Sequence, residues 1–549
     1  MKKILIFPIF AFIIMLSFAP TGFALYNSTD PWSMYRHDIA HSGVTPSNAP
    51  SSSNNNTRWS YTVSAMGLSA IATPLIVDGR VIFQVNDRVF AVDETNGIQL
   101  WSYQATGWLT APTYADGRVF VGSGVTDYNG GVICINASTG AEIWKKDLTT
   151  NYVKGTPLVS KGIVYAGVAS NITYAFEAAT GHFKWQYKTD GPVYSSPAAE
   201  GDILFFGSDK GTLYALNVSG PTPVQAWNFT ANGAIRSPPS INGDRVFFGS
   251  DNNKLHAINK TTGKLIWTWA TANPSAKIEN GVSVANNIVY VTSMDVAKVY
   301  ALYADAAPGN YTDPDFAISY WTRDLSSDGV GGLNEPVYAG GKIVVTGTGG
   351  SGSHLFALDA DVGNILWIHR RGWWSAMGTP VVADGRVWFS LYYSDPSYNL
   401  LLYCLGPAFP PTTYSYTVNA GGQSFNVTMK TNSTITEFNT ANLETQGKIS
   451  FKAKGIGTTG MCNITLPMDM IDGTYIITVD GGSPIYSATP VNNGTYVSLY
   501  FTYNTTSQHT IEITGTTFVP EFQPVTIAPI IAAVLLIALL KSKKATTLR

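Results

Sequence analysis

Short apolar strands separated by polar turns repeat along most of the chain. The stretch DRVFFGSDNNKLHAINKTTGKLIW, residues 244–267, contains an apolar run, an alternating run, a Thr-Gly turn and a last run that ends in tryptophan. The upstream stretches DILFFGSDKGTLYALNVSG…AW and RVFVGSG…GGVICINASTGAEIW follow the same order. Runs of this length bounded by Gly, Asn and Thr are typical of β-strands joined by tight turns. The pattern therefore predicts one supersecondary unit that occurs many times.

Tryptophan marks the last strand of each predicted unit. The tryptophans are 40 to 54 residues apart, at Trp59, Trp101, Trp144, Trp185, Trp227, Trp267, Trp321 and Trp367. A proline comes first in most units, at Pro74, Pro112, Pro157, Pro197, Pro239, Pro336 and Pro380. One unit, IENGVSVANNIVYVTS, has Gly281 near the place of this proline. A period near 40 to 50 residues with several strands per unit is typical of a β-propeller.

The count of units predicts how the ring closes. There are seven whole units and an eighth, residues 380–405, that lacks its last strand. The segment TRWSYTV, residues 57–63, carries Trp59 and can supply that strand, which would leave no open sheet edge in the ring. We therefore predict eight blades, with seven as the alternative if the long unit between Trp267 and Trp321 is irregular. Its extra length, YADAAPGNYTDPDFAIS, is expected to be a loop between its third and fourth strands.

The units resemble the pyrroloquinoline-quinone-type (PQQ-like) propeller repeats, which read dG.vy.gs.dg.lyAld..tG...W. The resemblance covers about residues 32–405. The stretch DPWSMYRHDIAHSGVTPSN, residues 30–48, also resembles the W..fr.d..h.G segment that leads into the repeats of this family. We interpret this lead-in as a segment that packs against the ring. The alternative is a His/Asp catalytic or metal site formed by Arg36, His37, Asp38 and His41.

A second β domain follows the repeats. After the Pro-rich stretch 407–411 the chain contains alternating strands such as KISFKA, TYIITVD and HTIEIT, separated by Asn, Gly and Thr. Short alternating strands over about a hundred residues predict an antiparallel β-sandwich. The segment GTTGMCNITLPMDMIDGTYIITVDG, with VPEFQP and the basic end, resembles a stalk domain of archaeal cell-surface proteins. That resemblance implies an archaeal envelope and a PEF-like processing motif at Pro520, Glu521 and Phe522.

The two ends of the chain predict export and anchoring. The start has two lysines, an apolar run and a Gly22-Phe23-Ala24 ending, which are the parts of a secretory signal peptide. Residues 525–540 form an uncharged apolar run followed at once by lysines. With the positive-inside rule, this run predicts a single-pass cell-membrane protein with an extracellular ectodomain and a cytoplasmic C-terminus.

The predicted fold is all-β: an eight-bladed β-propeller, an antiparallel immunoglobulin-like β-sandwich and one C-terminal transmembrane helix. The predicted divisions are a signal peptide (1–24), a lead-in segment (25–56), the propeller (57–406), a linker (407–413), the sandwich stalk (414–517), the PEF-like motif with the transmembrane helix (518–540) and a basic tail (541–549).

Composition narrows the function classes. Charged residues make up 13% of the chain and the formal net charge is −2, which gives no basic surface for nucleic acid. The three cysteines, Cys134, Cys404 and Cys462, lie far apart and predict buried small side chains, not a disulfide framework. Asn-x-Ser/Thr sequons are frequent, which is consistent with a glycosylated surface protein.

The loops that precede the prolines form the predicted binding face, because the first strand of each unit lines the central channel. Most units have a small polar residue there, at Thr73, Thr110, Thr156, Ser196, Ser237 and Thr379. The candidate ligand-binding residues depart from this pattern: Trp108, Arg236, Glu279, Asn280, Asn334, Glu335, Arg371, Trp373 and Trp374. Aromatic surfaces with convergent polar groups suit a sugar, a peptide or a flat ring. The alternative is that these side chains plug the channel or cap loops.

The chemistry that the resemblance implies finds little support in the residues. A quinoprotein dehydrogenase of this family needs a calcium-bound quinone, a catalytic aspartate and commonly a vicinal disulfide, and this chain has no adjacent cysteines. No nucleophile–base pair, phosphate loop or spaced set of metal ligands is recognisable. We therefore expect no cofactor, no catalytic residue and no metal, and a module that binds cell-surface proteins or glycans. The alternatives are a PQQ- and calcium-dependent oxidoreductase and a structural envelope component.

Overall fold

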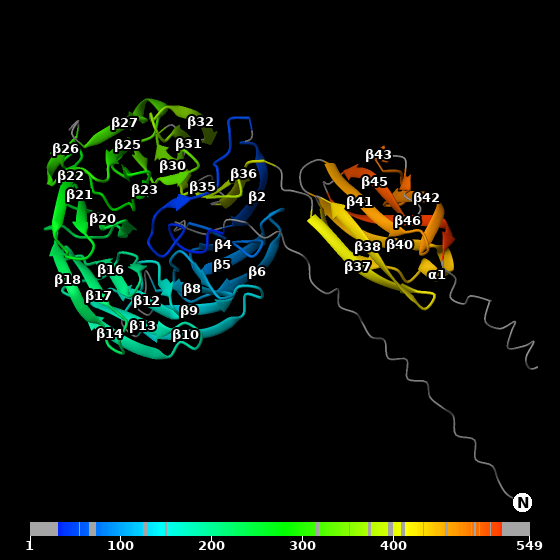
Figure 1. The fold of residues 1–549 in the computed structure, drawn as a ribbon, viewed down its shortest axis with the longest axis horizontal. Helices are drawn as coiled ribbons and strands as arrows, with labels where there is room; N and C mark the ends of the chain where they lie inside the picture. The colour runs from blue at the N-terminus through cyan, green and yellow to red at the C-terminus, as the bar shows by residue number, and fades with distance from the viewer. Residues whose placement is uncertain are drawn as a thin grey trace, which may run out of the picture.

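The computed structural model of the chain is all-β (Figure 1). It describes residues 31–53, 55–64, 73–124, 130–148, 151–313, 318–350, 352–371, 375–393, 399–407, 412–431, 433–455, 459–484, 486–487, 490–492, 495–504 and 507–518.

The first four sheets of the ring follow one plan. Each has a short first strand, then three longer strands, all antiparallel and in chain order. Their strands are β3 (Leu75–Val77), β4 (Arg80–Val85), β5 (Arg88–Asp93) and β6 (Gln99–Gln104); β7 (Thr113–Ala115), β8 (Arg118–Gly122), β9 (Gly130–Asn136) and β10 (Glu142–Leu148); β11 (Leu158–Ser160), β12 (Ile163–Val168), β13 (Ile172–Glu177) and β14 (Phe183–Lys188); and β15 (Ala198–Glu200), β16 (Ile203–Gly207), β17 (Thr212–Asn217) and β18 (Val224–Thr230).

Three further sheets keep this plan with additions. Their strands are β19 (Ser240–Asn242), β20 (Arg245–Ser250), β21 (Lys254–Asn259) and β22 (Leu265–Ala270); β23 (Ser283–Ala285), β24 (Ile288–Ser293), β25 (Val296–Tyr303) and β27 (Ser319–Asp324); and β29 (Val337–Ala339), β30 (Lys342–Gly349), β31 (Gly352–Asp359) and β32 (Ile365–Arg371). The additions are β26 (Gly309–Thr312), β28 (Gly332–Leu333), β1 (Val44–Thr45) and the 3-10 helix η1 (Ser326–Asp328).

The expected inserted loop was wrong in one respect. The insertion does lie between the third and fourth strands of its unit, but it contains strand β26, which pairs in parallel with β22 of the preceding sheet. Thr268 also donates its hydroxyl to Asn310 across this pair, at 2.6 Å. The insertion therefore covers the outer edge of the preceding sheet.

The last sheet closes the ring as the sequence predicts. It contains β33 (Ser375–Met377), β34 (Val381–Ala383), β35 (Arg386–Tyr393) and β36 (Asn399–Leu405), and its outer strand is β2 (Thr57–Ser64) from the other end of the repeat region. Strands β2 and β36 are antiparallel, with Trp59 opposite Cys404. In Figure 1 the sheets follow one another around the ring from blue to yellow, and β2 meets β36 where the two ends join.

The repeat tryptophans connect each sheet to the next. Seven of the eight donate their indole N–H to a backbone carbonyl of another segment, at 2.7–3.2 Å: Trp59 to Glu94, Trp101 to Ala137, Trp144 to Ala178, Trp227 to Lys260, Trp267 to Ala304, Trp321 to Ala360 and Trp367 to Pro50. In the first six pairs the acceptor lies in the turn before the last strand of the next sheet. The buried indole thus satisfies its one donor while it fills the space between sheets.

A glycine in the same turn lies directly on the preceding tryptophan ring. A Cβ atom added to Gly181 would lie 2.8 Å from the ring of Trp144, and one added to Gly263 would lie 2.7 Å from Trp227. Both glycines have a positive φ, as the turn requires. The Thr-Gly turn of the repeat is therefore both a backbone turn and a packing contact between sheets.

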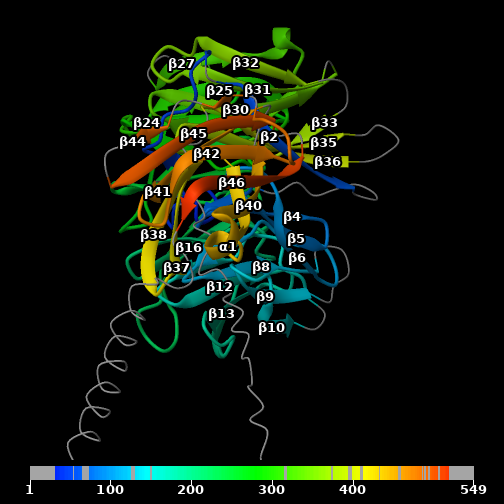
Figure 2. The ribbon, with the colours of Figure 1, turned by 90° about the vertical axis from the view of Figure 1, so that its right-hand side faces the viewer.

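The second unit consists of two antiparallel sheets around one hydrophobic core. The first sheet contains β37 (Thr412–Ala420), β38 (Gln423–Thr431), β41 (Thr459–Pro467), β45 (Tyr496–Asn504), β43 (Tyr486–Ser487) and β44 (Val491–Asn492). The second contains β39 (Ser433–Asn439), β40 (Lys448–Gly455), β46 (Gln508–Phe518) and β42 (Ile471–Val479), with helix α1 (Leu443–Gln446) nearby. Both sheets contribute alternating apolar side chains to the same core, and the unit is separate from the ring in Figure 1, whereas in Figure 2 its strands are drawn in front of the ring.

The structure contradicts the predicted localisation as a single-pass membrane protein. The described residues contain the helices η1 and α1, and a four-residue helix rises about 6 Å against the ~30 Å of a hydrocarbon core. No helix in the described part of the chain is long and apolar enough to cross a membrane, so a single-pass C-terminal helix is not supported. The residues on which the signal peptide, the PEF-like motif and the basic tail were predicted lie outside the described ones.

We predict that Gly181→Ala lowers stability much more than Gly162→Ala. Both glycines have a φ near +70°, so both substitutions introduce a similar backbone strain of about 1–2 kcal/mol. A Cβ at Gly162 meets nothing within 4 Å, whereas one at Gly181 overlaps Trp144, and overpacking costs a further ~1–3 kcal/mol. Thermal unfolding of the two full-length variants measures the difference. Equal Tm values would show that the glycine–tryptophan contact contributes nothing.

Candidate functional site

The lead-in segment, residues 31–50, runs along the inner strands of the ring. The middle residue of six inner strands donates its backbone N–H to a lead-in carbonyl, at 2.7–3.2 Å: Ile76 to Trp32, Tyr114 to Ser33, Ala199 to Ile39, Ile241 to Ala40, Val284 to Ser42 and Tyr338 to Gly43. These N–H groups face the middle of the ring, where an unpaired buried donor is costly. The lead-in therefore packs against the ring as predicted, and it satisfies the edges of most inner strands.

Arg36 extends from the lead-in into the centre of the ring. Its side chain is 1% exposed and its Nη1 lies 3.5 Å from Oε2 of Glu335. Its Nη2 donates to the carbonyl of Val282 at 2.5 Å and to Ser283 Oγ at 3.3 Å. The guanidinium is therefore fixed on several sides, and it neutralises a carboxylate that is itself 7% exposed.

Glu335 accepts hydrogen bonds from three further groups. The hydroxyl of Tyr35 and the backbone N–H of Gly281 donate to Oε1, the latter at 3.0 Å, and the hydroxyl of Thr379 donates to Oε2 at 3.3 Å. Burial, together with the Glu335 carboxylate, raises the pKa of Tyr35 well above its usual value, so the phenol stays a donor. Glu335 therefore joins the lead-in to two sheets.

Gly281 stands where the other units have proline, and the structure explains the exchange. A proline would have no N–H for Glu335. A Cβ at this position would also lie 2.6 Å from Cδ of Arg36. The missing proline in the sequence thus marks the place where Arg36 enters the ring.

Asp38 and His41 make local structural contacts in the lead-in. Asp38 accepts hydrogen bonds from the backbone N–H groups of Ala40 and Ser42 and from the Ser42 hydroxyl, so it holds a local turn. His41 is 2% exposed, and burial, with the nearby Arg36, lowers its pKa to about 3. The described residues contain no group of three or more His, Cys, Asp or Glu that could hold a metal.

A charged network lies at the channel mouth, at the same end of the sheets as Glu335, because its Glu279 is two residues before Gly281, whose N–H binds Glu335. Arg236 makes a two-point contact with Asp209 at 3.0 and 3.1 Å and also contacts Asp251 at 2.9 Å and Glu279 at 3.1 Å. Lys277 lies 3.4 Å from Asp251. Two cations thus face three carboxylates across neighbouring sheets.

The groups of the network shift the pKa values of one another. The Asp209 carboxylate, ahead of the other acids, raises the pKa of Arg236, so the guanidinium remains charged. Burial raises the pKa of Asp251 and the neighbouring Glu279 raises it further, against the attraction of Arg236. Because Arg236 and its partners are part-exposed, the network is a surface for polar contacts more than a source of stability.

A pair of tyrosines continues this surface. Tyr152 and Tyr194 stack with ring centroids 5.9 Å apart, and their hydroxyls are 2.8 Å apart. The ammonium of Lys154 lies over the Tyr194 ring, 4.9 Å from its centroid. Burial and the Tyr152 hydroxyl raise the pKa of Tyr194, so the Tyr194 hydroxyl remains protonated at neutral pH. The mouth therefore presents aromatic faces next to the Arg236 network.

The structure brings some of the predicted site residues together. Arg236 contacts Glu279 directly, and the Ser237 hydroxyl donates to the carbonyl of Asn280 at 2.9 Å. The side chain of Asn280 donates to Thr292 and to the carbonyl of Leu333, and that of Asn334 donates to Thr346, so both amides brace loops.

Other predicted site residues stand apart from this group. Trp108 is half-buried, and its carbonyl accepts the N–H of Gly124. Arg371 ends strand β32, while Trp373 and Trp374 lie outside the described residues.

Sequence reasoning missed several residues of the mouth. Asp209 and Asp251 occupy turns in which Asp is common, and Tyr152 and Tyr194 lie in loops without a repeat motif. A signal was present for the aspartates, because both occur in the same GSD triplet of consecutive units and face the same arginine.

The described oxygen donors at the channel do not fit a calcium-bound quinone. Both carboxylate oxygens of Glu335 are used by Tyr35, Gly281, Thr379 and Arg36. A cation next to the Arg36 guanidinium would also be repelled. The residues present at this position favour a structural role for Glu335.

We predict strong coupling between Arg36 and Glu335. Arg36→Met and Glu335→Gln should each lower the free energy of unfolding by about 3–5 kcal/mol, because each leaves a buried charge without its partner. The double variant should lose clearly less than the two single losses combined. Urea titration of the three variants and the parent chain gives the coupling energy. Additive losses would contradict a direct interaction.

We also predict that His41 makes the protein sensitive to acid. Its pKa is about 3 in the folded state and ~6.5 when unfolded, so below pH 6.5 the unfolded state binds the additional proton. Its contribution to stability is complete above pH 6.5 and falls by roughly 1.4 kcal/mol per pH unit toward pH 3. His41→Phe should show a flatter dependence of Tm on pH between 6.5 and 4. Parallel curves for the two proteins would refute this assignment.

Comparison with known proteins gives a consistent picture of the ring. The sequence model of the family described as outer membrane protein assembly factor BamB matches residues 49–111, 106–222 and 190–312. BamB of Yersinia pestis is 26% identical over 306 residues, which cover 48% of this chain and 72% of that protein. The quinohemoprotein alcohol dehydrogenase of Comamonas testosteroni is 30% identical over 155 residues, or 24% of this chain. The chain thus spans 21% of the length of that dehydrogenase.

A solved structure agrees at the level of the fold. The crystal structure of quinohemoprotein alcohol dehydrogenase from Comamonas testosteroni aligns with a TM-score of 0.55 at 14% identity, over 72% of this chain and 83% of that one. At this identity the likeness concerns the fold alone. The ring is thus similar in sequence to BamB-type repeats over residues 49–312 and similar in fold to the dehydrogenase.

Proposed function

We propose that the ring is a non-catalytic binding or scaffolding module for a protein or glycan partner. The observation that carries the proposal is the path of the lead-in, whose carbonyls accept the N–H groups of six inner strands while Arg36 engages Glu335 at the centre. The lead-in thus already occupies the inner-strand N–H groups and the Glu335 carboxylate, which a ligand in the channel would need. The name of the BamB relatives, an assembly factor, is in keeping with a role in protein contacts.

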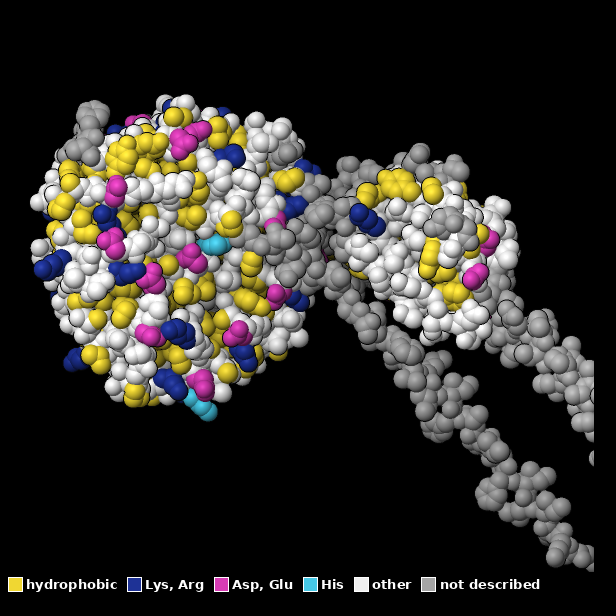
Figure 3. Space-filling view, viewed as in Figure 1, with side chains coloured by type: hydrophobic (Ala, Val, Ile, Leu, Met, Phe, Trp, Pro, Cys, Tyr) yellow, Lys and Arg dark blue, Asp and Glu magenta, His cyan; other side chains and the backbone are white. Residues whose placement is uncertain are grey.

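The mouth is the proposed partner surface. Arg236, its three carboxylates and the Tyr152–Tyr194 pair offer polar and aromatic groups on part-exposed loops. Lys/Arg and Asp/Glu side chains are also interspersed across the face of the ring in Figure 3. Such mixed surfaces favour specific pairing over attraction to a polyanion. Arg236→Ala should weaken the partner complex about tenfold or more, as for an arginine at the centre of an interface.

We also propose the finer architecture that the sequence predicts. The sheets of the ring then form eight blades, residues 57–406, followed by a linker at 407–413 and an immunoglobulin-like sandwich at 414–517. The eight sheets of the described ring and the two-sheet core of the second unit support this division. An archaeal origin and a glycosylated surface remain predictions from the sequence.

The alternative is a PQQ- and calcium-dependent oxidoreductase, which the dehydrogenase relative favours. One titration decides between the two. We expect that pyrroloquinoline quinone with calcium, added to the full chain, gives no saturable heat and no shift of the quinone absorbance, because Arg36 occupies the centre of the ring beside Glu335. One-to-one binding that disappears with a calcium chelator would overturn the proposal.

A further inference from the structure

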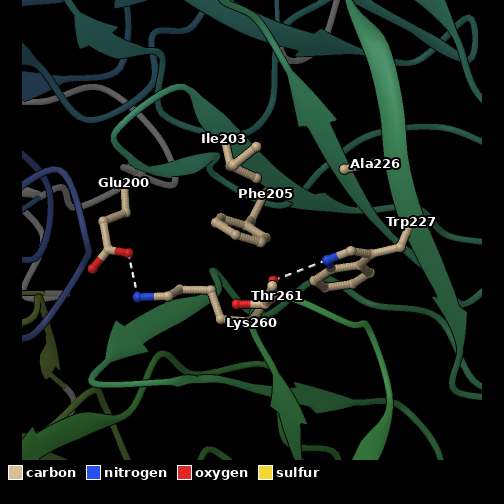
Figure 4. Close-up of a pocket in the computed structure, with 7 residues that line it drawn as sticks. All are labelled: Glu200, Ile203, Phe205, Ala226, Trp227, Lys260 and Thr261. Atoms are coloured by element: carbon tan, nitrogen blue, oxygen red, sulfur yellow. Dashed lines mark hydrogen bonds and ion pairs between the residues drawn. The ribbon is translucent and has the colours of Figure 1, made fainter.

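One junction between sheets contains a pocket. It lies between the sheet of β15–β18 and the sheet of β19–β22, has a volume of about 170 Å³, and is lined by Glu200, Ile203, Phe205, Ala226, Trp227, Lys260 and Thr261 (Figure 4). Its residues come from the end of β15, from β16 and β18, and from the turn between β21 and β22. Because consecutive turns of an antiparallel sheet lie at opposite ends, the pocket is at the end of the sheets away from the Arg236 network.

The pocket walls are mainly apolar. Phe205 and Trp227 have ring centroids 5.7 Å apart, at an interplanar angle of 47°. The Trp227 indole donates to the carbonyl of Lys260 at 2.9 Å, and Gly263 packs on the ring. Ile203 and Ala226 complete the apolar lining. The cavity is therefore formed before any ligand arrives, which lowers the entropic cost of binding.

The rim carries a charged pair at two positions that are uncharged at the junctions of Trp101, Trp144, Trp267 and Trp321. At the four equivalent junctions of Trp101, Trp144, Trp267 and Trp321, the residue that accepts the indole N–H is alanine, and here it is Lys260. The last residue of the inner strand is Glu200 here, whereas the other inner strands end in Val77, Ala115, Ser160, Asn242, Ala285, Ala339 and Ala383. Lys260 and Glu200 form an ion pair across the pocket mouth (Figure 4).

The pair retains the capacity to bind a peptide group. Lys260 Nζ donates to Glu200 and, at 2.6 Å, to the carbonyl of Gly243. An ammonium has three N–H donors, so one is left for a carbonyl oxygen, and the Glu200 carboxylate has further lone pairs for an N–H group. A peptide bond presents one acceptor and one donor, and the rim offers one of each. A free anion or cation would meet an unfavourable charge on one side of the rim.

The size and surroundings of the cavity indicate a single side chain. An apolar cavity of roughly 150 Å³ holds a benzene ring, so 170 Å³ accommodates a phenyl or branched aliphatic group. Val224, two residues before Ala226 on the same strand, is 63% exposed and extends the apolar surface. An extended segment of a partner can therefore cover Val224 while one of its side chains enters the pocket.

We propose that this pocket binds an apolar side chain of an extended segment of a partner protein, whose backbone C=O and N–H pair with Lys260 and Glu200. The proposal rests on the binding role of the ring but concerns a different surface from the Arg236 network. Variants at the two places distinguish partner binding at this pocket from binding at the Arg236 network.

The test uses the full chain and a phage library of random dodecapeptides as the probe. The key variant is Ala226→Trp, which fills the pocket from a β-bulge position without removing a hydrogen bond. Lys184→Trp is the matched control, because Lys184 occupies the same bulge next to Trp185 in the preceding sheet. Lys260→Met removes the rim ammonium and keeps the backbone carbonyl that holds Trp227.

We expect selected peptides to share an aromatic or branched apolar residue. They should bind Ala226→Trp and Lys260→Met about tenfold or more weakly than the parent, and bind Lys184→Trp and Arg236→Ala within about twofold of it. Circular dichroism and Tm values show whether each variant is folded. No selected peptide, or peptides that bind Ala226→Trp as well as the parent, would overturn the pocket proposal. Loss of binding confined to Arg236→Ala would overturn it too, and would support the mouth surface instead.

Discussion

The contact on which the ring depends is the one between a tryptophan and the turn of the next sheet. Each sheet is a small four-stranded unit that cannot bury both of its faces by itself. The tryptophan places a large apolar ring between neighbours, and its N–H donates to a carbonyl in the same turn whose glycine packs on the ring, as Trp227 does with Lys260 and Gly263. One side chain therefore provides apolar burial, a satisfied donor and a fixed spacing. The tryptophan therefore fixes the position of each sheet relative to the next, although the chain does not connect their outer strands directly.

This contact also explains why the fold was predictable from the sequence and the centre of the ring was not. The tryptophan and the Thr-Gly turn repeat at a fixed spacing, so periodicity alone indicates the strands, their order and the pairing of β2 with β36. Arg36 and Glu335 are 299 residues apart and belong to no repeat. Their contact forms because the lead-in, which has no regular secondary structure around Arg36, packs against the ring. The hydrophobic pattern of the sequence contains no information about this contact. The one local trace was Gly281, which replaces a proline so that its N–H can reach Glu335.

The mouth was predictable in part, for a related reason. Arg236 and Glu279 were identified because they depart from the small polar residues that other units have at the same place. Asp209 and Asp251 lie in turns, where aspartate is common, so a comparison of the repeat units does not identify them as unusual. A repeat protein thus reveals its specific residues where the repeat is broken. Residues that fit the usual turn preference and also bind another side chain are not recognised in this way.

The junctions on either side of the last sheet, where the two ends of the repeat region meet, differ from the others. At the junction of β2 with the first sheet, the carbonyl that accepts the Trp59 indole belongs to Glu94, where most other junctions have alanine. The Glu94 side chain is fully buried, and burial, with Asp384 adding to it, raises the pKa of its carboxyl well above the usual range. At the other side of the last sheet, Trp367 donates to Pro50 of the lead-in instead of to a turn. Both exceptions fall where the two ends of the repeat region meet. There the last sheet is completed by a strand that no turn connects to it, and Trp367 donates to the lead-in where an ordinary junction donates to the turn of the next sheet.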